Sequence, residues 1–213
     1  MKLKQSQLSY LCERGRNYDR KYRMFELLID KIPDQLNLVL ELFGGVGIQS
    51  YYLQNNKKIS EHIAIDCDPN CYEIAKKLLP DITHINCNSF TYTSDKKIDL
   101  LVCDSVFNKK EFENITDLVS KFDFEYLILT VTGVFNVRFN KNLTYNQYWT
   151  NLISDLQKKG LYASHIVYSS DFGLMLIQKD KAECSEIERL NNNNLSTKWR
   201  KYTEVIKNGN KEI

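Results

Sequence analysis

The stretch Val39-Leu-Glu-Leu-Phe-Gly-Gly-Val-Gly-Ile-Gln-Ser50 joins an apolar run, a glycine-rich turn and the start of a helix. Such a run predicts a buried strand that leads through a tight turn into a helix. Gly44, Gly45 and Gly47 allow backbone conformations that side chains disfavour, and they let a ligand approach the bare backbone. Because the N-terminus of the following helix favours negative charge, the segment indicates a site for a nucleotide-like ligand.

The rest of the chain alternates short apolar runs with longer amphipathic stretches, which is typical of a doubly wound, mostly parallel α/β sheet. We expect strands near residues 38–42, 62–66, 82–86, 99–104 and 125–132, and helices near residues 48–54, 70–79, 110–121 and 145–159. Two more strands, within residues 162–170 and 174–178, are joined by a turn too short for a crossover helix and predict an antiparallel hairpin. The sequence therefore predicts a seven-stranded sheet that closes with this hairpin.

The length of 213 residues fits one domain with short terminal additions. An amphipathic helix is expected over residues 18–32, so we divide the chain into three parts. These are a small helical N-terminal extension (1–36), the sheet domain (37–180) and a polar, basic C-terminal tail (181–213) that offers a short basic helix near 199–207.

Overall charge does not select a partner, since 29 Lys and Arg residues face 27 Asp and Glu residues. Six cysteines in a chain of this length favour reduced thiols. The sequence has no apolar signal core at its start and no run near the roughly 18 apolar residues that a membrane span needs. We therefore expect a soluble, cytoplasmic protein with no membrane association.

A second segment, Ile63-Ala-Ile-Asp-Cys-Asp-Pro-Asn70, ends a buried strand about twenty residues after the glycine turn. Asp66 stands where doubly wound folds place a carboxylate that accepts hydrogen bonds from ribose hydroxyls. Asp68 is expected to cap the next helix, with Pro69 in the first turn, where proline is tolerated.

Together, Glu41-Leu-Phe-Gly-Gly-Val-Gly47 and Ala64-Ile-Asp-Cys-Asp-Pro69 resemble the first two motifs of class I S-adenosylmethionine-dependent methyltransferases, and the likeness extends loosely from residue 39 to 179. Glu41, Gly45 and Gly47 match the first motif, whereas Phe43 replaces its first glycine. An aromatic residue there is common in the nucleic-acid methyltransferases of this class.

The third and fourth motifs of that family resemble Asn86-Cys-Asn-Ser-Phe90 and Asp99-Leu-Leu-Val-Cys-Asp-Ser-Val-Phe107. The resemblance implies S-adenosylmethionine as cofactor, with Asp66 on its ribose and Asn88 and Ser89 beside its adenine. Asp104 and Phe107 fit the acceptor motif of amino-methylating enzymes, although Ser105 and Val106 replace its two prolines. The cofactor contacts implied in this way are Glu41, Phe43, Gly44, Gly45, Gly47, Asp66, Cys67, Asn88 and Ser89, and the catalytic residues are Asp104 and Phe107.

A methyltransferase acting on DNA or RNA is the function that we expect. Asp104 would orient the acceptor or take its proton. Basic and aromatic residues interleave in segments 14–23 and 198–202, where they either contact phosphates and bases or form solvated helix faces. Two alternatives stay open, namely a non-catalytic accessory subunit with a protein partner, and a methyltransferase for small molecules or proteins.

Other site types fit the sequence less well. A nicotinamide dehydrogenase is disfavoured because the closing hairpin is foreign to the usual dinucleotide fold and Ser50 stands in place of a third glycine. Cys67, Cys71, His84 and Cys87 have a spacing that suggests zinc, but they fall at strand ends and a helix start, so we expect no metal. His62 and His165 lie in apolar strands and are expected to be structural.

Overall fold

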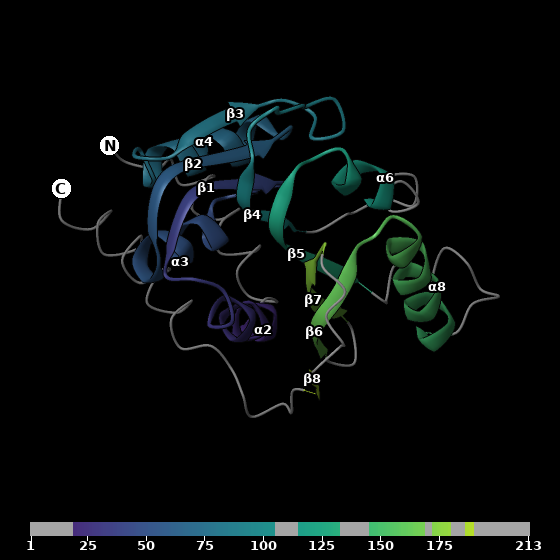
Figure 1. Cartoon of the computed structure of the whole chain (residues 1–213). Helices are drawn as coiled ribbons and strands as arrows, with labels where there is room; N and C mark the ends of the chain where they lie inside the picture. Colours follow the sequence, from purple (N-terminus) through teal and green to yellow (C-terminus); the bar gives the residue numbers. More distant parts are fainter. Residues whose placement is uncertain (1–18, 105–114, 133–144, 169–171, 180–185, 190–213) are drawn as a thin grey trace.

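Eight strands form one mixed sheet in the computed structural model, which describes residues 19–104, 115–132, 145–168, 172–179 and 186–189 (Figure 1). The strands are β1 (Gln35–Leu42), β2 (Lys58–Asp66), β3 (Thr83–Asn86), β4 (Ile98–Cys103), β5 (Phe124–Thr132), β6 (Tyr162–Tyr168), β7 (Phe172–Gln178) and β8 (Glu186–Arg189). Their order across the sheet is β3-β2-β1-β4-β5-β7-β6-β8.

The first seven strands confirm the predicted doubly wound sheet. Strands β1 to β5 pair in parallel, and β7 runs antiparallel to both β5 and β6, which gives the expected closing hairpin. The short strand β8 extends the sheet beyond the seven predicted strands, because it pairs in parallel with β6. It comes from the segment that the sequence presented only as a polar tail.

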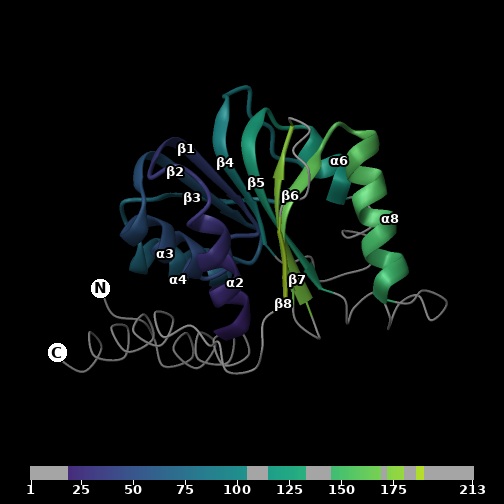
Figure 2. The same cartoon turned by 60° about the horizontal axis from the view of Figure 1, so that its bottom comes forward.

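Helices cover both faces of the sheet, as Figure 2 shows. The described helices are α2 (Asp19–Ile29), α3 (Ile48–Asn56), α4 (Pro69–Leu78), α6 (Ile115–Ser120) and α8 (Tyr145–Lys158). Helices α2, α3 and α4 lie on one face, and α6 and α8 lie on the other. None of these helices is both long and apolar enough to cross a bilayer.

Each face of the sheet has its own apolar core, because side chains alternate along a strand. Leu38, Leu40 and Leu42 of β1 belong to the core under α6 and α8. On the opposite face, Val39 joins the core that includes Phe25, Leu28 and Ile29 of α2. The helix predicted over residues 18–32 is thus confirmed as part of this packing.

The connection between β3 and β4 departs from a regular alternation of strand and helix, since its described residues 87–97 contain no helix. Phe90 and Tyr92 of this connection pack against the core under α6 and α8.

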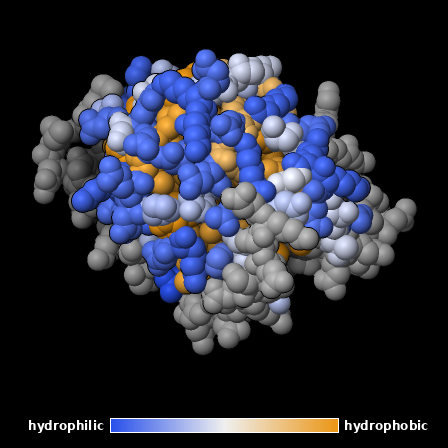
Figure 3. Space-filling model, viewed as in Figure 1, coloured by the Kyte–Doolittle hydropathy of each residue, from blue (hydrophilic) through white to orange (hydrophobic). Residues whose placement is uncertain are grey.

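Figure 3 shows apolar patches between hydrophilic side chains on the face of the molecule that Figure 1 presents. The predicted helix over 110–121 is described only from Ile115, because residues 110–114 lie outside the described part.

Candidate functional site

The glycine turn, residues 43–47, connects β1 to α3 at the carboxyl edge of the parallel strands. Phe43, Gly45 and Gly47 have φ angles of 61°, 56° and 82°, and Phe43 is the one non-glycine residue with positive φ in the described part of the chain. The Gly44 amide donates to the carbonyl of Ile65 on β2 at 2.8 Å. Left-handed residues thus alternate along the turn, and the amides of Phe43, Gly44, Gly45 and Gly47 all donate within the protein.

Packing within the protein explains why Gly47 must be glycine. A Cβ atom at Gly47 would lie 2.8 Å from Cδ1 of Leu79 and 3.5 Å from Cβ of Ala75, which brings the turn directly against α4 and its C-terminal cap. At Gly44 a Cβ atom would lie 3.4 Å from Cβ of Ala64. The turn is therefore closely packed against other parts of the chain, and the close approach of a ligand stays a prediction.

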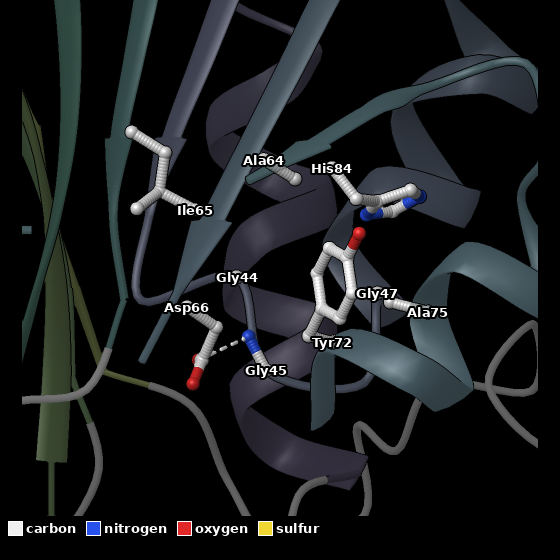
Figure 4. A pocket seen from close by; sticks show the side chains of 9 residues that line it. All are labelled: Gly44, Gly45, Gly47, Ala64, Ile65, Asp66, Tyr72, Ala75 and His84. Atoms are coloured by element: carbon white, nitrogen blue, oxygen red, sulfur yellow. Dashed lines mark hydrogen bonds between the residues drawn. The ribbon is translucent and has the colours of Figure 1, made fainter. Parts of the chain in front are cut away.

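Asp66 ends β2 and fixes the glycine turn through its carboxylate. One oxygen, Oδ2, accepts a hydrogen bond from the Gly45 amide at 2.8 Å, and the other, Oδ1, accepts from the Asp68 amide at 2.8 Å (Figure 4). The side chain of Asn86 donates to the Asp66 carbonyl at 2.8 Å. Because a carboxylate offers about four acceptor positions, these bonds are compatible with the predicted contacts to ribose hydroxyls.

Phe43 and Ser89 join the turn to the end of β3. The Phe43 amide donates to the buried hydroxyl of Ser89 at 3.3 Å. The Phe43 ring meets the Phe90 ring edge to face, with 5.8 Å between centroids. Neighbouring Asn88 is exposed, and its side-chain oxygen accepts from the Phe90 amide at 2.9 Å. The structure therefore bonds Ser89 to the turn, with Asn88 next to it in the sequence, and the contacts of both residues with an adenine stay a prediction.

Glu41 lies in the interior, with 1% of its surface exposed, although the resemblance implied a cofactor contact. Its Oε1 accepts from Nε2 of His62 at 2.5 Å, and Nδ1 of His62 accepts from the Gln54 amide at 3.0 Å. An amide nitrogen only donates, so these two hydrogen bonds place the imidazole proton of His62 on Nε2. Glu41 thus links β1, β2 and α3, and His62 has the structural role expected of it.

Asp104 follows β4 and is 8% exposed. Its Oδ1 accepts from the Thr130 hydroxyl at 2.7 Å, and its Oδ2 accepts from the side-chain amide of Gln49. No pattern in the sequence indicated these two partners: Thr130 on β5 meets Asp104 through the register of the sheet, and Gln49 through the placement of α3. Phe107, predicted as the second catalytic residue, lies outside the described residues.

A pocket opens between the glycine turn, β2, β3 and α4, as Figure 4 shows. It is lined by Gly44, Gly45, Gly47, Ala64, Ile65, Asp66, Tyr72, Ala75 and His84. The space between these lining residues, including the part open to solvent, is about 210 Å³.

Tyr72 and His84 form the inner wall of this pocket, and in Figure 4 the Tyr72 hydroxyl points toward the His84 ring. The His84 ring nitrogen Nε2 lies 2.9 Å from the Leu79 carbonyl oxygen, which requires a proton on Nε2. Burial lowers the pKa of His84 below its ordinary value, which favours the neutral ring.

No group of three or more His, Cys, Asp or Glu side chains is placed to hold a metal ion anywhere in the described ranges. Cys67 is exposed directly after Asp66, whereas Cys71 is buried and donates to Asp68 at 3.6 Å. Burial raises the pKa of Cys87, which follows β3. His165 contacts the Ser164 hydroxyl at 3.2 Å within β6.

No protein-family model and no curated protein matches the sequence. Solved structures do match the fold. A structure of the Trm112 methyltransferase activator in complex with a proposed methyltransferase of Haloferax volcanii aligns with a TM-score of 0.62 and 10% identity, over 84% of this chain and 100% of the other.

Two further structures show the same similarity. A proposed RNA methyltransferase from Pyrococcus horikoshii has a TM-score of 0.57 and 10% identity, over 75% of this chain and 82% of the other. Magnesium protoporphyrin IX methyltransferase from Synechocystis, solved with bound S-adenosylmethionine, has a TM-score of 0.56 and 15% identity, over 81% of this chain and 84% of the other. With its strand order and closing hairpin, this chain has the fold of the class I S-adenosylmethionine-dependent methyltransferases.

Proposed function

We propose that the chain binds S-adenosylmethionine at the glycine turn and transfers its methyl group to an acceptor. The observation that carries this proposal is the turn itself, in which Phe43, Gly45 and Gly47 are left-handed and Asp66 holds the Gly45 amide at 2.8 Å. This places glycine backbone and a carboxylate together at the carboxyl edge of β1 and β2, where open α/β sheets bind ligands. The Synechocystis neighbour, solved with this cofactor, supports the assignment.

Each predicted contact fits a part of the cofactor. Asp66 would accept the ribose hydroxyls, and Asn88 with Ser89 would lie beside the adenine. When bound, the cofactor supplies an electrophilic methyl group on its sulfonium, so the protein needs to position the acceptor in line and exclude water. Asp104 directly follows β4 at the same edge of the sheet, and we assign it to orienting the acceptor or taking its proton.

A nucleic acid is the acceptor that we propose. Phe43 in the first motif, the spacing from Asp104 to Phe107, and the basic and aromatic segments 14–23 and 198–202 support this choice. The Pyrococcus neighbour is a proposed RNA methyltransferase, whereas the Synechocystis neighbour acts on a porphyrin. Fold similarity therefore does not select the acceptor, and the support comes from this chain's residues.

A non-catalytic accessory subunit is the second candidate. It is favoured by Asp104, whose two oxygens already accept from Thr130 and Gln49, and by Ser105 and Val106 in place of the prolines of the acceptor motif. The Haloferax neighbour was solved with an activator protein, which supports a role for a protein partner.

Calorimetric titration with S-adenosylmethionine tests the first proposal. We expect micromolar binding by the wild type, at least a tenfold loss in Asp66→Asn, and a change below twofold in Asp68→Asn. Asp68→Asn is the matched control because Asp68 accepts from the Asn70 amide as the N-cap of α4, a role that asparagine fills equally well. Absence of binding by folded wild type would refute the proposal.

Transfer of a labelled methyl group to DNA and RNA then separates the two candidates. Methylation of nucleic acid, with binding that weakens as salt rises, is expected for the enzyme. Cofactor binding without transfer to DNA, RNA, proteins or small molecules, unless a partner chain is added, would support the accessory subunit instead.

A further inference from the structure

Asp104 contacts the chain on both sides of the glycine turn. Its backbone amide donates to the carbonyl of Leu42, the last residue of β1, at 3.3 Å. Its carboxylate accepts from the side chain of Gln49, the second residue of α3. Asp104, which follows β4, therefore bonds to the residue just before the glycine turn and to the helix just after it. We call Asp104, Leu42, Gln49 and Thr130 the Asp104 cluster.

The polar side chains of the Asp104 cluster are buried and bonded to one another. Asp104, Gln49 and Thr130 are 8%, 5% and 4% exposed, and the Thr130 hydroxyl holds the second carboxylate oxygen at 2.7 Å. Leu42 also pairs with Cys103, the last residue of the neighbouring parallel strand β4, which Asp104 directly follows. Buried side-chain hydrogen bonds of this kind fix geometry, because a broken bond leaves a polar group without water.

We propose that Asp104 and Gln49 are positioning residues that hold the two ends of the glycine turn at a fixed separation and thereby shape the cofactor site. This inference rests on the proposed binding of S-adenosylmethionine at the turn. It assigns Asp104 a task besides its proposed work on the acceptor, and it gives Gln49 a role that no sequence motif indicates. The placement of the Gly45 amide against Asp66 then depends on a residue at the end of a different strand.

The variant Gln49→Glu tests this assignment because it keeps the shape of the side chain and replaces the donor by a carboxyl group. Above its pKa the new carboxylate opposes Asp104. Two adjacent carboxyl groups cannot both ionise easily, so the new carboxyl group and Asp104 share one proton once the pH falls. The protonated oxygen then donates a hydrogen bond to its neighbour. The hydrogen bond of the wild type is thus lost at high pH and restored at low pH.

Cofactor affinity measured at pH 8 and pH 5.5 provides the first readout. For Gln49→Glu we expect a loss of about tenfold relative to the wild type at pH 8 and recovery to within about twofold at pH 5.5. The matched control is Gln157→Glu, the same change at an exposed position of α8 on the other face of the sheet, which should bind like the wild type at both pH values. Unchanged affinity, or an equal loss at both pH values, would overturn the proposal.

Amide hydrogen exchange of residues 43–48 without cofactor provides the second readout. After correction for the intrinsic rates, these amides should exchange faster in Gln49→Glu than in the wild type at pH 8, and equally at pH 5.5. Because this measurement needs no cofactor, it decides the positioning role even if the wild type fails to bind S-adenosylmethionine. Equal protection of the turn in both proteins at pH 8 would refute the role of Gln49.

Discussion

Replacing Gly47 by alanine tests how closely the glycine turn packs against α4. Alanine at a φ of 82° is left-handed, which costs about 1–2 kcal/mol. Its Cβ atom would lie 2.8 Å from Cδ1 of Leu79, so Leu79 must shift, and overpacking of this kind typically costs about 1–3 kcal/mol. The reduced freedom of the unfolded chain offsets about 0.4–1 kcal/mol. We expect a net loss of about 2 kcal/mol in the free energy of unfolding.

The matched control for this substitution is Gly160→Ala. Gly160 has a φ of 72°, and a Cβ atom there would meet no atom within 4 Å. Both variants therefore carry a similar backbone strain, but only Gly47→Ala adds the contact with Leu79. Urea unfolding followed by circular dichroism should show a loss about 1 kcal/mol or more larger for Gly47→Ala, and a loss of 2 kcal/mol should lower its Tm by roughly 4–8 °C.

Combining Gly47→Ala with Leu79→Ala separates steric overlap from backbone strain. If overlap with Leu79 causes the extra loss, the two substitutions together should cost less than the sum of the single losses. Equal losses for Gly47→Ala and Gly160→Ala, or strict additivity in the double variant, would refute the conclusion that packing against α4 requires glycine at position 47.

Two further predictions concern His62 and His84. His62→Leu leaves the Glu41 carboxylate buried without its hydrogen-bond donor, so urea unfolding should show a loss of about 3 kcal/mol, much of it recovered by Glu41→Leu in the same chain; additive losses would contradict this. Because burial lowers the pKa of His84, the unfolded chain takes up a proton near pH 6.5 before the folded chain does. Stability should therefore fall from pH 7.5 to 5.5, and His84→Gln should flatten that decline; equal slopes for both proteins would contradict it.

The sequence predicted the strands from their buried parts and missed their exposed parts. In β2 the apolar run begins at His62, but the strand starts at Lys58, because Lys58 and Ser60 are exposed and interrupt the apolar pattern. Similarly, β1 begins at Gln35 rather than at residue 38. Strand β8 was missed because its four residues show no apolar run, and it is recognisable only by its pairing with β6.

For the candidate site, the sequence predicted those features that neighbouring residues in the chain determine. The glycine turn and Asp66 follow from a strand, a turn and a helix start that are contiguous or nearly so. The partners of Glu41 and Asp104 could not be predicted. His62 and Thr130 meet them through the pairing of β2 with β1 and of β5 with β4, and Gln49 meets Asp104 through the placement of α3. These partners depend on strand register and helix packing, which one sequence does not specify.

The two outer strands of the sheet, β3 and β8, are each only four residues long. An outer strand exposes unpaired backbone groups that can recruit a strand from another molecule, and short outer strands limit that recruitment. Without β8, the seven-residue strand β6 would be the outer strand on this side and would expose more backbone groups to a strand of another molecule. The few residues of β8 therefore protect the folded chain against aggregation through its sheet.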